Sequence, residues 1–419
     1  MPAHGDVIHH RFLCPAQVFE PLSLSEDDKL PTDIELVMGY RGIIPIDHCA
    51  AAMQRGLPFF PHLTGRMIHD AQLQRTFIIP ASGELQMEVV ESDEETSIRD
   101  WESMPLHQQS SAFIPLQRNT TEAGSLFGIR LTQMHASGLS VIGMRVSHAA
   151  VDGTGLALFI HHCTAGLRGV GDVTLFHERR VGFGSSLDGP NEIPYGYEMA
   201  YGNRASVWTD DVLTHSTPVV FVIPVGEVKK HFDVVSILDA RLHLGAWLCL
   251  HLAQLHTHYE ELALWCDARG TNGIPATFTG NVGCFLHFPL SQNERQKLTQ
   301  QLRSVASRGG FQIIADTYRN IKQAEARADP LKWSGASKNI LQLNFVPHAV
   351  AVTDFGYGLP SYALLLSRNS SGLRIALSVD ASCFLIEACL PDGLGNSLVE
   401  TCRAAQMNVS VWCQGPSRI

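Results

Sequence analysis

The stretch that decides the fold is SVIGMRVSHAAVDGTGLALFIHHC, residues 140–163. Its first half alternates with a period of two, as a strand requires, and so places on one face Ile142, Met144, Val146 and His148. Past Gly155 the apolar residues instead follow the i, i+3, i+4, i+7 spacing of a helix with one buried side, at Leu156, Phe159, Ile160, Cys163 and Leu167. The stretch therefore predicts a strand that turns directly into a helix, with His148 at the end of the strand.

The same two patterns recur on both sides of this stretch. Helices are predicted over 49–56 and 237–255, and the proline-bounded apolar run 218–224 predicts a buried strand. Further strands are predicted over 361–367 and 373–379, joined by a turn in the NSSG sequence that ends at Gly372. Because helices and strands are mixed in both halves, we expect an α/β protein.

The length of 419 residues is typical of two or three domains. The stretch 181–194 is rich in glycine, serine and proline and predicts an exposed loop, and the segment after it is polar and weakly periodic. We therefore expect an N-terminal domain over 1–200, a crossover loop over 201–217 and a C-terminal domain over 218–419.

Composition narrows the functional class. The formal net charge of −10 argues against a general nucleic-acid binder, because such a protein needs a basic face. The ten cysteines form no C-x-x-C pair and several lie in apolar runs, a pattern typical of buried free thiols in a reducing compartment. No apolar run reaches the ~18 residues that span a bilayer, and residues 1–17 have no stretch of signal-peptide type. These features predict a cytoplasmic protein that binds neither nucleic acid nor membrane.

His148 is the residue of the opening stretch with the clearest chemical use. An imidazole, with an ordinary pKa of about 6.5, suits a general base at neutral pH. Gly153 and Gly155 would let the backbone approach a ligand closely or adopt a positive φ. A single histidine at a strand end is nevertheless more often a satisfied polar residue than a catalyst, so this run alone does not decide the role of His148.

A second glycine-rich segment, DFGYG from Asp354 to Gly358, lies between an apolar run and a predicted strand. HAAVDG at 148–153 and DFGYG at 354–358 resemble the HxxxDG and DFGWG signatures of the BAHD acyl-CoA-dependent acyltransferases. The two segments also follow each other in the same order as in that family. Weaker matches extend the resemblance over most of the chain. PHLTGR at 61–66 resembles the PLAGR segment of that family. Ser236, Asp239-Ala240 and Trp247 resemble its S-x-x-D-A helix ending in Trp. Asp267-Ala268-Arg269, followed by Thr279-Gly280-Asn281, resembles its D-x-R and G-N pair.

The resemblance implies two similar-sized α/β domains of the chloramphenicol-acetyltransferase type with an active-site channel between them. It implies that His148 takes the proton of a hydroxyl or amine while this group attacks the thioester of acyl-CoA, and then returns the proton to the departing thiolate. Acyl-CoA would be the co-substrate, no cofactor would be bound permanently, and no acyl-enzyme is required. The partner would be a small acceptor of secondary metabolism, and we expect the protein to be a monomer.

The other matched residues have structural roles in the family. The resemblance implies that Asp152 pairs with Arg269 and holds the loop after His148 in shape, with Gly153 in the same loop. It also implies that Asp354 fixes its own loop far from the chemistry, and that this loop turns tightly at Gly356 and Gly358.

Two positions depart from the family pattern. Tyr357 stands where the family has Trp, and Leu343-Asn344-Phe345 stands where it often has Thr-Ser-Trp. In related enzymes the hydroxyl at the first of these three positions donates to the developing oxyanion, but a leucine has no donor. The candidate replacements are Asn344, Tyr357 or a backbone N–H, and one such donor contributes about 3 kcal/mol in the transition state.

Three other functions stay open. A condensation-type enzyme that uses carrier-protein thioesters usually has HHxxxDG, whereas Ser147 precedes His148 here. A repurposed family member would use His148 for proton transfer in a cyclisation or isomerisation, and Leu343 keeps this alternative open. A binding protein without catalysis is the third. We expect no metal site, because His251 and His256 lack the i, i+4 spacing of a helical ligand pair and no HExxH or cysteine cluster occurs.

Overall fold

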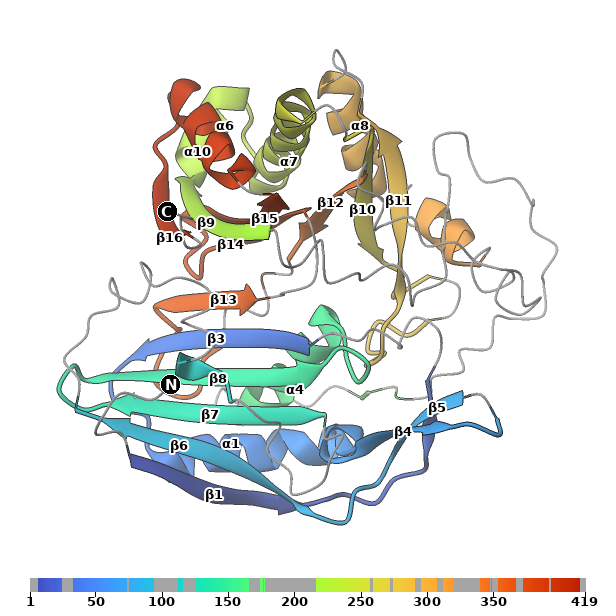
Figure 1. The fold of residues 1–419 in the computed structure, drawn as a ribbon, viewed down its shortest axis with the longest axis vertical. Helices are drawn as coiled ribbons and strands as arrows, with labels where there is room; N and C mark the ends of the chain where they lie inside the picture. Colours follow the sequence, from blue (N-terminus) through green and yellow to red (C-terminus); the bar gives the residue numbers. More distant parts are fainter. Residues whose placement is uncertain are drawn as a thin grey trace. The chain divides into compact units, whose positions relative to one another are not determined.

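The chain forms two compact units, which Figure 1 shows in sequence colours. The first unit comprises Met1–Arg180, Thr277–Asn281 and Pro347–Arg368, and the second comprises Val181–Ala276, Val282–Val346 and Asn369–Ile419. The structure is a computed structural model, and it describes residues 7–24, 33–73, 75–93, 112–115, 126–165, 174–175, 177, 216–256, 259–271, 274–290, 295–306, 312–319, 340–346, 348, 353–366, 372–391 and 393–414.

A six-stranded sheet is the frame of the first unit. Its order is β1 (Val7–Pro15), β6 (Glu84–Ser92), β7 (Phe127–Met134), β8 (Leu139–Ser147), β3 (Asp33–Arg41) and β13 (Tyr362–Leu366). The β6 and β7 strands are parallel and the other neighbours are antiparallel. A smaller sheet has the order β2 (Leu22–Ser23), β5 (Arg75–Ile79) and β4 (Arg66–Asp70), and the helical elements are α1 (Ile46–Gly56), the short 3-10 turns η2 (Leu57–Phe59) and η3 (Pro61–Thr64), and α4 (Gly153–Ala165).

The core of the first unit grows from alternate residues of these strands. Met38 of β3 lies opposite Ile142 of β8, and both side chains are fully buried in one apolar cluster with residues of α1 and α4 such as Met53 and Phe159. Each such side chain contributes about 1.5–3 kcal/mol by leaving water. The alternation predicted for β8 is therefore confirmed, and this strand ends at Ser147, one residue before His148.

A seven-stranded sheet is the frame of the second unit. Its order is β11 (Gly283–Pro289), β10 (Glu261–Asp267), β12 (Ile340–Phe345), β14 (Gly372–Leu377), β15 (Cys383–Pro391), β9 (Ser216–Pro224) and β16 (Ser410–Gln414). The β12 strand is parallel to both of its neighbours, and the other pairs are antiparallel. The helices of this unit include α6 (Val225–Phe232), α7 (Ile237–Leu255), α8 (Arg295–Ala306), a short helix over 312–319, and α10 (Leu394–Ala404).

Several predicted elements are confirmed. The helix expected over 237–255 is α7, whose N-terminus is capped because the Ser236 hydroxyl oxygen accepts a hydrogen bond from the backbone N–H of Asp239 at 2.9 Å. The helix expected over 49–56 is α1, and the strand over 218–224 is β9. The loop at 181–194 and the apolar position Leu167 lie outside the described residues.

The strands expected over 361–367 and 373–379 are confirmed as β13 and β14, while residues 369–371 of the expected turn lie outside the described residues. The two strands do not pair with each other. The first, β13, pairs with β3 in the sheet of the first unit, whereas the second, β14, lies between β12 and β15 in the sheet of the second unit. Turn-forming residues between two strands determine only how the chain can bend there. They do not decide which edge each strand joins, because pairing depends on partners distant in sequence.

The two units are therefore not two consecutive halves of the chain. The DFGYG segment was assigned to the domain over 218–419, but Pro347–Arg368 belongs to the first unit, where β13 adds a strand to the edge of β3. The boundary expected over 201–217 stays a prediction, because 201–215 lie outside the described residues. In the part of the chain that the structure describes, no helix has the length and apolarity needed to cross a membrane.

Candidate functional site

His148 lies in the tight turn that connects β8 to α4. The carbonyl of Ser147 accepts hydrogen bonds from the backbone N–H groups of Ala150 at 2.9 Å and Val151 at 3.4 Å. The three residues after His148 are almost fully buried, at 1% or less exposed, whereas His148 itself is only half-buried. The residues that follow His148 thus anchor the turn in the core, while His148 itself is less deeply buried.

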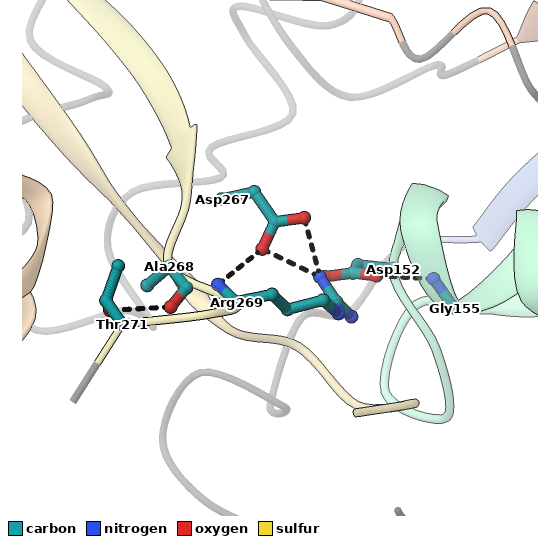
Figure 2. A network of polar contacts seen from close by, with 6 residues as sticks. All are labelled: Asp152, Gly155, Asp267, Ala268, Arg269 and Thr271. Carbon is teal, nitrogen blue, oxygen red and sulfur yellow. Dashed lines mark hydrogen bonds and ion pairs between the residues drawn. The ribbon is translucent and has the colours of Figure 1, made fainter. Parts of the chain in front are cut away.

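Asp152 is the N-cap of α4. Its Oδ1 accepts a hydrogen bond from the backbone N–H of Gly155 at 2.8 Å (Figure 2). Its carbonyl accepts a hydrogen bond from the backbone N–H of Leu156 at 2.8 Å. A carboxylate at this position satisfies a helix N–H that would otherwise lack a partner and also favours the positive end of the helix dipole. Because Asp152 is only 5% exposed, it fixes the geometry of the turn that carries His148 from within.

The two glycines of this turn have different roles. A Cβ on Gly155 would lie 2.4 Å from the carbonyl oxygen of Thr279, so only glycine allows these two backbones to approach so closely. A Cβ on Gly153 would meet nothing within 4 Å, and Gly153 is not among the glycines with a positive φ. The expected positive φ is therefore wrong for both glycines, whereas a close approach of either to a ligand stays a prediction. Gly153 is the first residue of α4.

A distant segment of the first unit, Thr277–Asn281, lies against the same turn. Asn281 donates a hydrogen bond from Nδ2 to the backbone carbonyl of His148 at 2.6 Å. Both Asn281 and Thr279 are buried, at 3% and 0% exposed. Thr279 and Asn281 belong to the G-N match in the sequence, which gives them no role, and no local pattern around 281 indicates a contact with 148.

Thr279 contacts a cluster of aromatic and imidazole rings through His177. Its hydroxyl shares a hydrogen bond of 2.9 Å with Nδ1 of His177, whose ring lies 5.2 Å from that of His62 and 5.7 Å from that of Phe60. His162 of α4 is fully buried and stacks on Phe59 at 4.3 Å. Among the described residues, no three or more His, Cys, Asp or Glu side chains are arranged to hold a metal ion.

The DFGYG loop is held in the first unit by its backbone and by one ring. Asp354 accepts a hydrogen bond at Oδ1 from the N–H of Gly356 at 2.7 Å, and Gly356 and Gly358 have φ values of 87° and 83°. Phe355 is fully buried and meets Tyr40 edge to face at 6.1 Å, while Tyr357 is 37% exposed. The positive φ values and the Asp354 bond match the loop-shaping roles expected of these residues.

Arg269 follows β10 in the second unit. Its Nη1 donates to both carboxylate oxygens of Asp267 at 3.0 Å, and its backbone N–H donates to Asp267 Oδ1 at 2.9 Å (Figure 2). The guanidinium is almost fully buried, with 5% of its side chain exposed. The pairing of Arg269 with Asp152 stays a prediction.

The candidate oxyanion positions lie on β12 and on the DFGYG loop. Leu343 is fully buried and packs beside Gly245 of α7, so it lies in the core of the second unit. Asn344, the next residue, is half-buried and lies opposite Arg374 of β14. Because side chains alternate along a strand, Asn344 is directed away from the face that packs on α7.

The arrangement around His148 therefore combines a half-buried histidine with a backbone held by the Ser147 carbonyl, by the Asp152 cap and by Asn281. A histidine held in this way can exchange a proton with a ligand at a defined position, because its Cα is not free to move. Asp152 and Asn281 are used in hydrogen bonds to backbone atoms, which makes them parts of the frame.

Several solved structures share the fold of this chain. No protein-family profile and no curated protein sequence matches this chain. TRI101 of F. graminearum, solved with coenzyme A and deoxynivalenol, has a TM-score of 0.69 at 13% identity, over 94% of this chain and 100% of that one. Vinorine synthase has a TM-score of 0.65 at 12% identity, over 94% and 96% of the two chains. The starter condensation domain of rhizomide synthetase, as a variant in complex with C8-CoA and Leu-SNAC, has a TM-score of 0.60 at 14% identity, over 92% and 94%. The predicted α/β fold of the chloramphenicol-acetyltransferase type is thereby confirmed, and this chain shares it with these proteins over nearly its whole length.

Proposed function

We propose that this protein transfers an acyl group from a CoA thioester to a hydroxyl or amine of a small acceptor, with His148 as general base. The observation that carries the proposal is the position of His148: a half-buried histidine on a turn whose backbone is fixed by Asp152 and Asn281. That turn lies in a fold shared with TRI101, which was solved with coenzyme A and a small molecule.

The proposed reaction needs one proton acceptor and one oxyanion donor. His148 takes the proton as the acceptor oxygen or nitrogen attacks the thioester carbonyl, which forms a tetrahedral oxyanion. The C–S bond then breaks, and the imidazolium returns the proton to the CoA thiolate. A general base in such a position contributes typically 10²–10⁴-fold in rate.

The oxyanion donor stays unassigned between Asn344, Tyr357 and a backbone N–H. Leu343 cannot take this role, because it has no donor and is buried against α7. Asn344 is favoured on β12 because it is half-buried and directed away from that helix. If it is the donor, Asn344→Ala should lower kcat by roughly 10²–10³-fold, the loss typical of one removed oxyanion donor.

The supporting roles belong to the same proposal. Asp152 shapes the turn as the cap of α4, and Arg269 and Asp354 hold their own loops through hydrogen bonds. Acyl-CoA is then a co-substrate that leaves as free CoA, and no permanently bound cofactor is proposed. The seven cysteines that are buried among the nine free ones described agree with a cytoplasmic location, and we propose a monomeric enzyme there.

A second candidate is a condensation-type reaction with a carrier-protein thioester, since a condensation domain shares the fold. Against it, the residue before His148 is Ser147 rather than histidine. The two candidate reactions use the same base but take the acyl group from different thioesters, acyl-CoA or an acylated carrier protein. The identity of the acyl donor therefore distinguishes them.

The test measures thiol release from acetyl-CoA and longer acyl-CoA thioesters against a panel of alcohols and amines. The same acyl groups on a carrier protein serve as the competing donors. CoA-dependent turnover that falls at least ~100-fold in His148→Ala, with an unchanged melting temperature, supports the proposal. Turnover that survives this substitution contradicts it, and activity with the carrier thioester alone transfers the assignment to the condensation class. Failure of every donor, with tight binding of a small ligand, would favour the repurposed reaction.

A further inference from the structure

We infer that Asn281 is a positioning residue for the base: its amide holds the backbone of His148 so that the imidazole has one defined direction. This inference rests on the proposed function, because a base must be present for its direction to matter. Nothing in the sequence around 281 assigns this role, and it follows from a contact between residues that are 133 positions apart.

The contact is short and protected from water. Asn281 Nδ2 and the carbonyl oxygen of His148 are 2.6 Å apart, and the Asn281 side chain is buried, at 3% exposed. In such a site water cannot replace the amide without reorganising the packing, so the hydrogen bond fixes the peptide plane that follows His148. That plane is covalently linked to the Cα from which the imidazole projects.

A second contact shows that the whole segment, and not Asn281 alone, is fitted to the turn. The carbonyl of Thr279 packs against Gly155 at a distance that excludes any Cβ there. The hydroxyl of Thr279 is in turn held by His177 at 2.9 Å. Residues 279–281 thus contact the turn at two points, at His148 and at Gly155 near the start of α4. Two separate contacts restrict the movement of the turn relative to this segment more than one contact would.

The turn has its own local bonds, to which Asn281 adds a bond at the carbonyl of His148. Ser147 accepts the N–H groups of Ala150 and Val151, and Asp152 caps α4. These bonds fix the residues after His148. Asn281 adds the restraint at His148 itself, and a misplacement of a catalytic group by about 1 Å can cost about 100-fold in rate.

The chain offers a matched control. Gln133 of β7 also donates from a buried side-chain amide to a backbone carbonyl, that of Ile44, at 2.6 Å, and Gln133 is 4% exposed. Both residues lie in the first unit, and the variants Asn281→Leu and Gln133→Met each remove such a hydrogen bond from a side-chain amide to a backbone carbonyl. The two substitutions should therefore cost similar stability, so only a positioning role distinguishes their kinetics.

The experiment compares Asn281→Leu, Gln133→Met and His148→Ala with the wild type, using the acyl-CoA and acceptor found in the panel. We expect Asn281→Leu to lower kcat by roughly 10–100-fold with little change in the KM for acyl-CoA, whereas Gln133→Met keeps kcat within about 2-fold. Asn281→Ser, which is smaller and cannot reach the carbonyl, serves if the leucine variant does not fold. In ¹³C-histidine-labelled protein, the His148 resonance, identified by its loss in His148→Ala, should shift in the Asn281 variants and not in Gln133→Met.

The failures of the two proposals are separable. A wild-type kcat in both Asn281 variants, or a loss of kcat in Gln133→Met equal to theirs, overturns the positioning role. If His148→Ala is inactive in the same experiment, the proposed base is still supported. Full turnover in His148→Ala overturns the proposed function, and the positioning role falls with it.

Discussion

His48 and Phe355, which lie 307 positions apart, are joined by a hydrogen bond of 2.6 Å in which Nε2 of His48 donates to the backbone carbonyl of Phe355. The ring of His48 also meets that of Tyr357 edge to face at 5.3 Å. A residue of α1 thus holds both the buried and the exposed aromatic side of the DFGYG loop. This contact gives a physical reason for an aromatic residue at 357, because a ring of either Tyr or Trp can pack on an imidazole.

We expect His48→Ala to loosen this loop. Removing the donor should cost about 0.5–1.5 kcal/mol of the free energy of unfolding, the net worth of one hydrogen bond. Amide hydrogen exchange across 353–361 should become faster, measured by mass spectrometry. The control is His69→Ala, because His69 is exposed and its ring shares a 3.3 Å hydrogen bond with the Thr76 hydroxyl on the neighbouring strand β5, so it should leave exchange in this loop unchanged. Equal exchange in wild type and His48→Ala would show that the loop is held by Phe355 and the backbone alone.

Gly356 and Gly153 make a matched pair for the role of glycine. Gly356 has a φ of 87°, so Gly356→Ala should destabilise the protein by about 1–2 kcal/mol, the cost of a Cβ in the left-handed region. Gly153 has open space around its Cα and lies in α4, so Gly153→Ala should be neutral or stabilising by about 0.4–1 kcal/mol. Urea unfolding of both variants measures the difference. A loss in Gly153→Ala as large as that in Gly356→Ala would mean that Gly153 is needed for a reason other than backbone conformation.

Arg374 and Glu387 form a buried ion pair across β14 and β15, at 3.0 Å and with 9% and 7% of their side chains exposed. Glu387→Gln should cost about 3–5 kcal/mol, because the guanidinium keeps its charge in a buried site, whereas the double variant Arg374→Met with Glu387→Met should recover most of this loss. The exposed pair of Arg403 and Glu400 is the control, and its removal should cost less than about 1 kcal/mol. A double variant as unstable as the single one would instead assign the pair an essential structural role.

What the sequence predicts here depends on how local each feature is. The helix over 237–255 is predicted to the residue because a capping serine precedes a long apolar run. His148, Asp152 and Asp354 are found because their motifs are contiguous. The pairing of β13 with β3, the His48 contact and the Asn281 contact are not predictable, because each joins residues far apart whose meeting depends on the register of the whole sheet.

Asp152 has two possible contributions to stability that one pair of substitutions separates. Asp152→Asn keeps an oxygen that can accept the N–H of Gly155, and asparagine caps helices as well as aspartate does, so the cap should survive. Asp152→Ala removes the cap and should cost about 0.5–2 kcal/mol for that reason alone. If the predicted pairing with Arg269 holds, Asp152→Asn should also lower stability, but by less than the about 3–5 kcal/mol of an uncompensated buried charge, because Asp267 still pairs with the guanidinium. Adding Arg269→Met to Asp152→Asn should then cost little more, which a double-mutant cycle by urea unfolding would measure.

An Asp152→Asn variant as stable as wild type would remove the ion pair and leave the cap as the role of this residue. A variant that folds normally but loses turnover would contradict a purely structural role for Asp152.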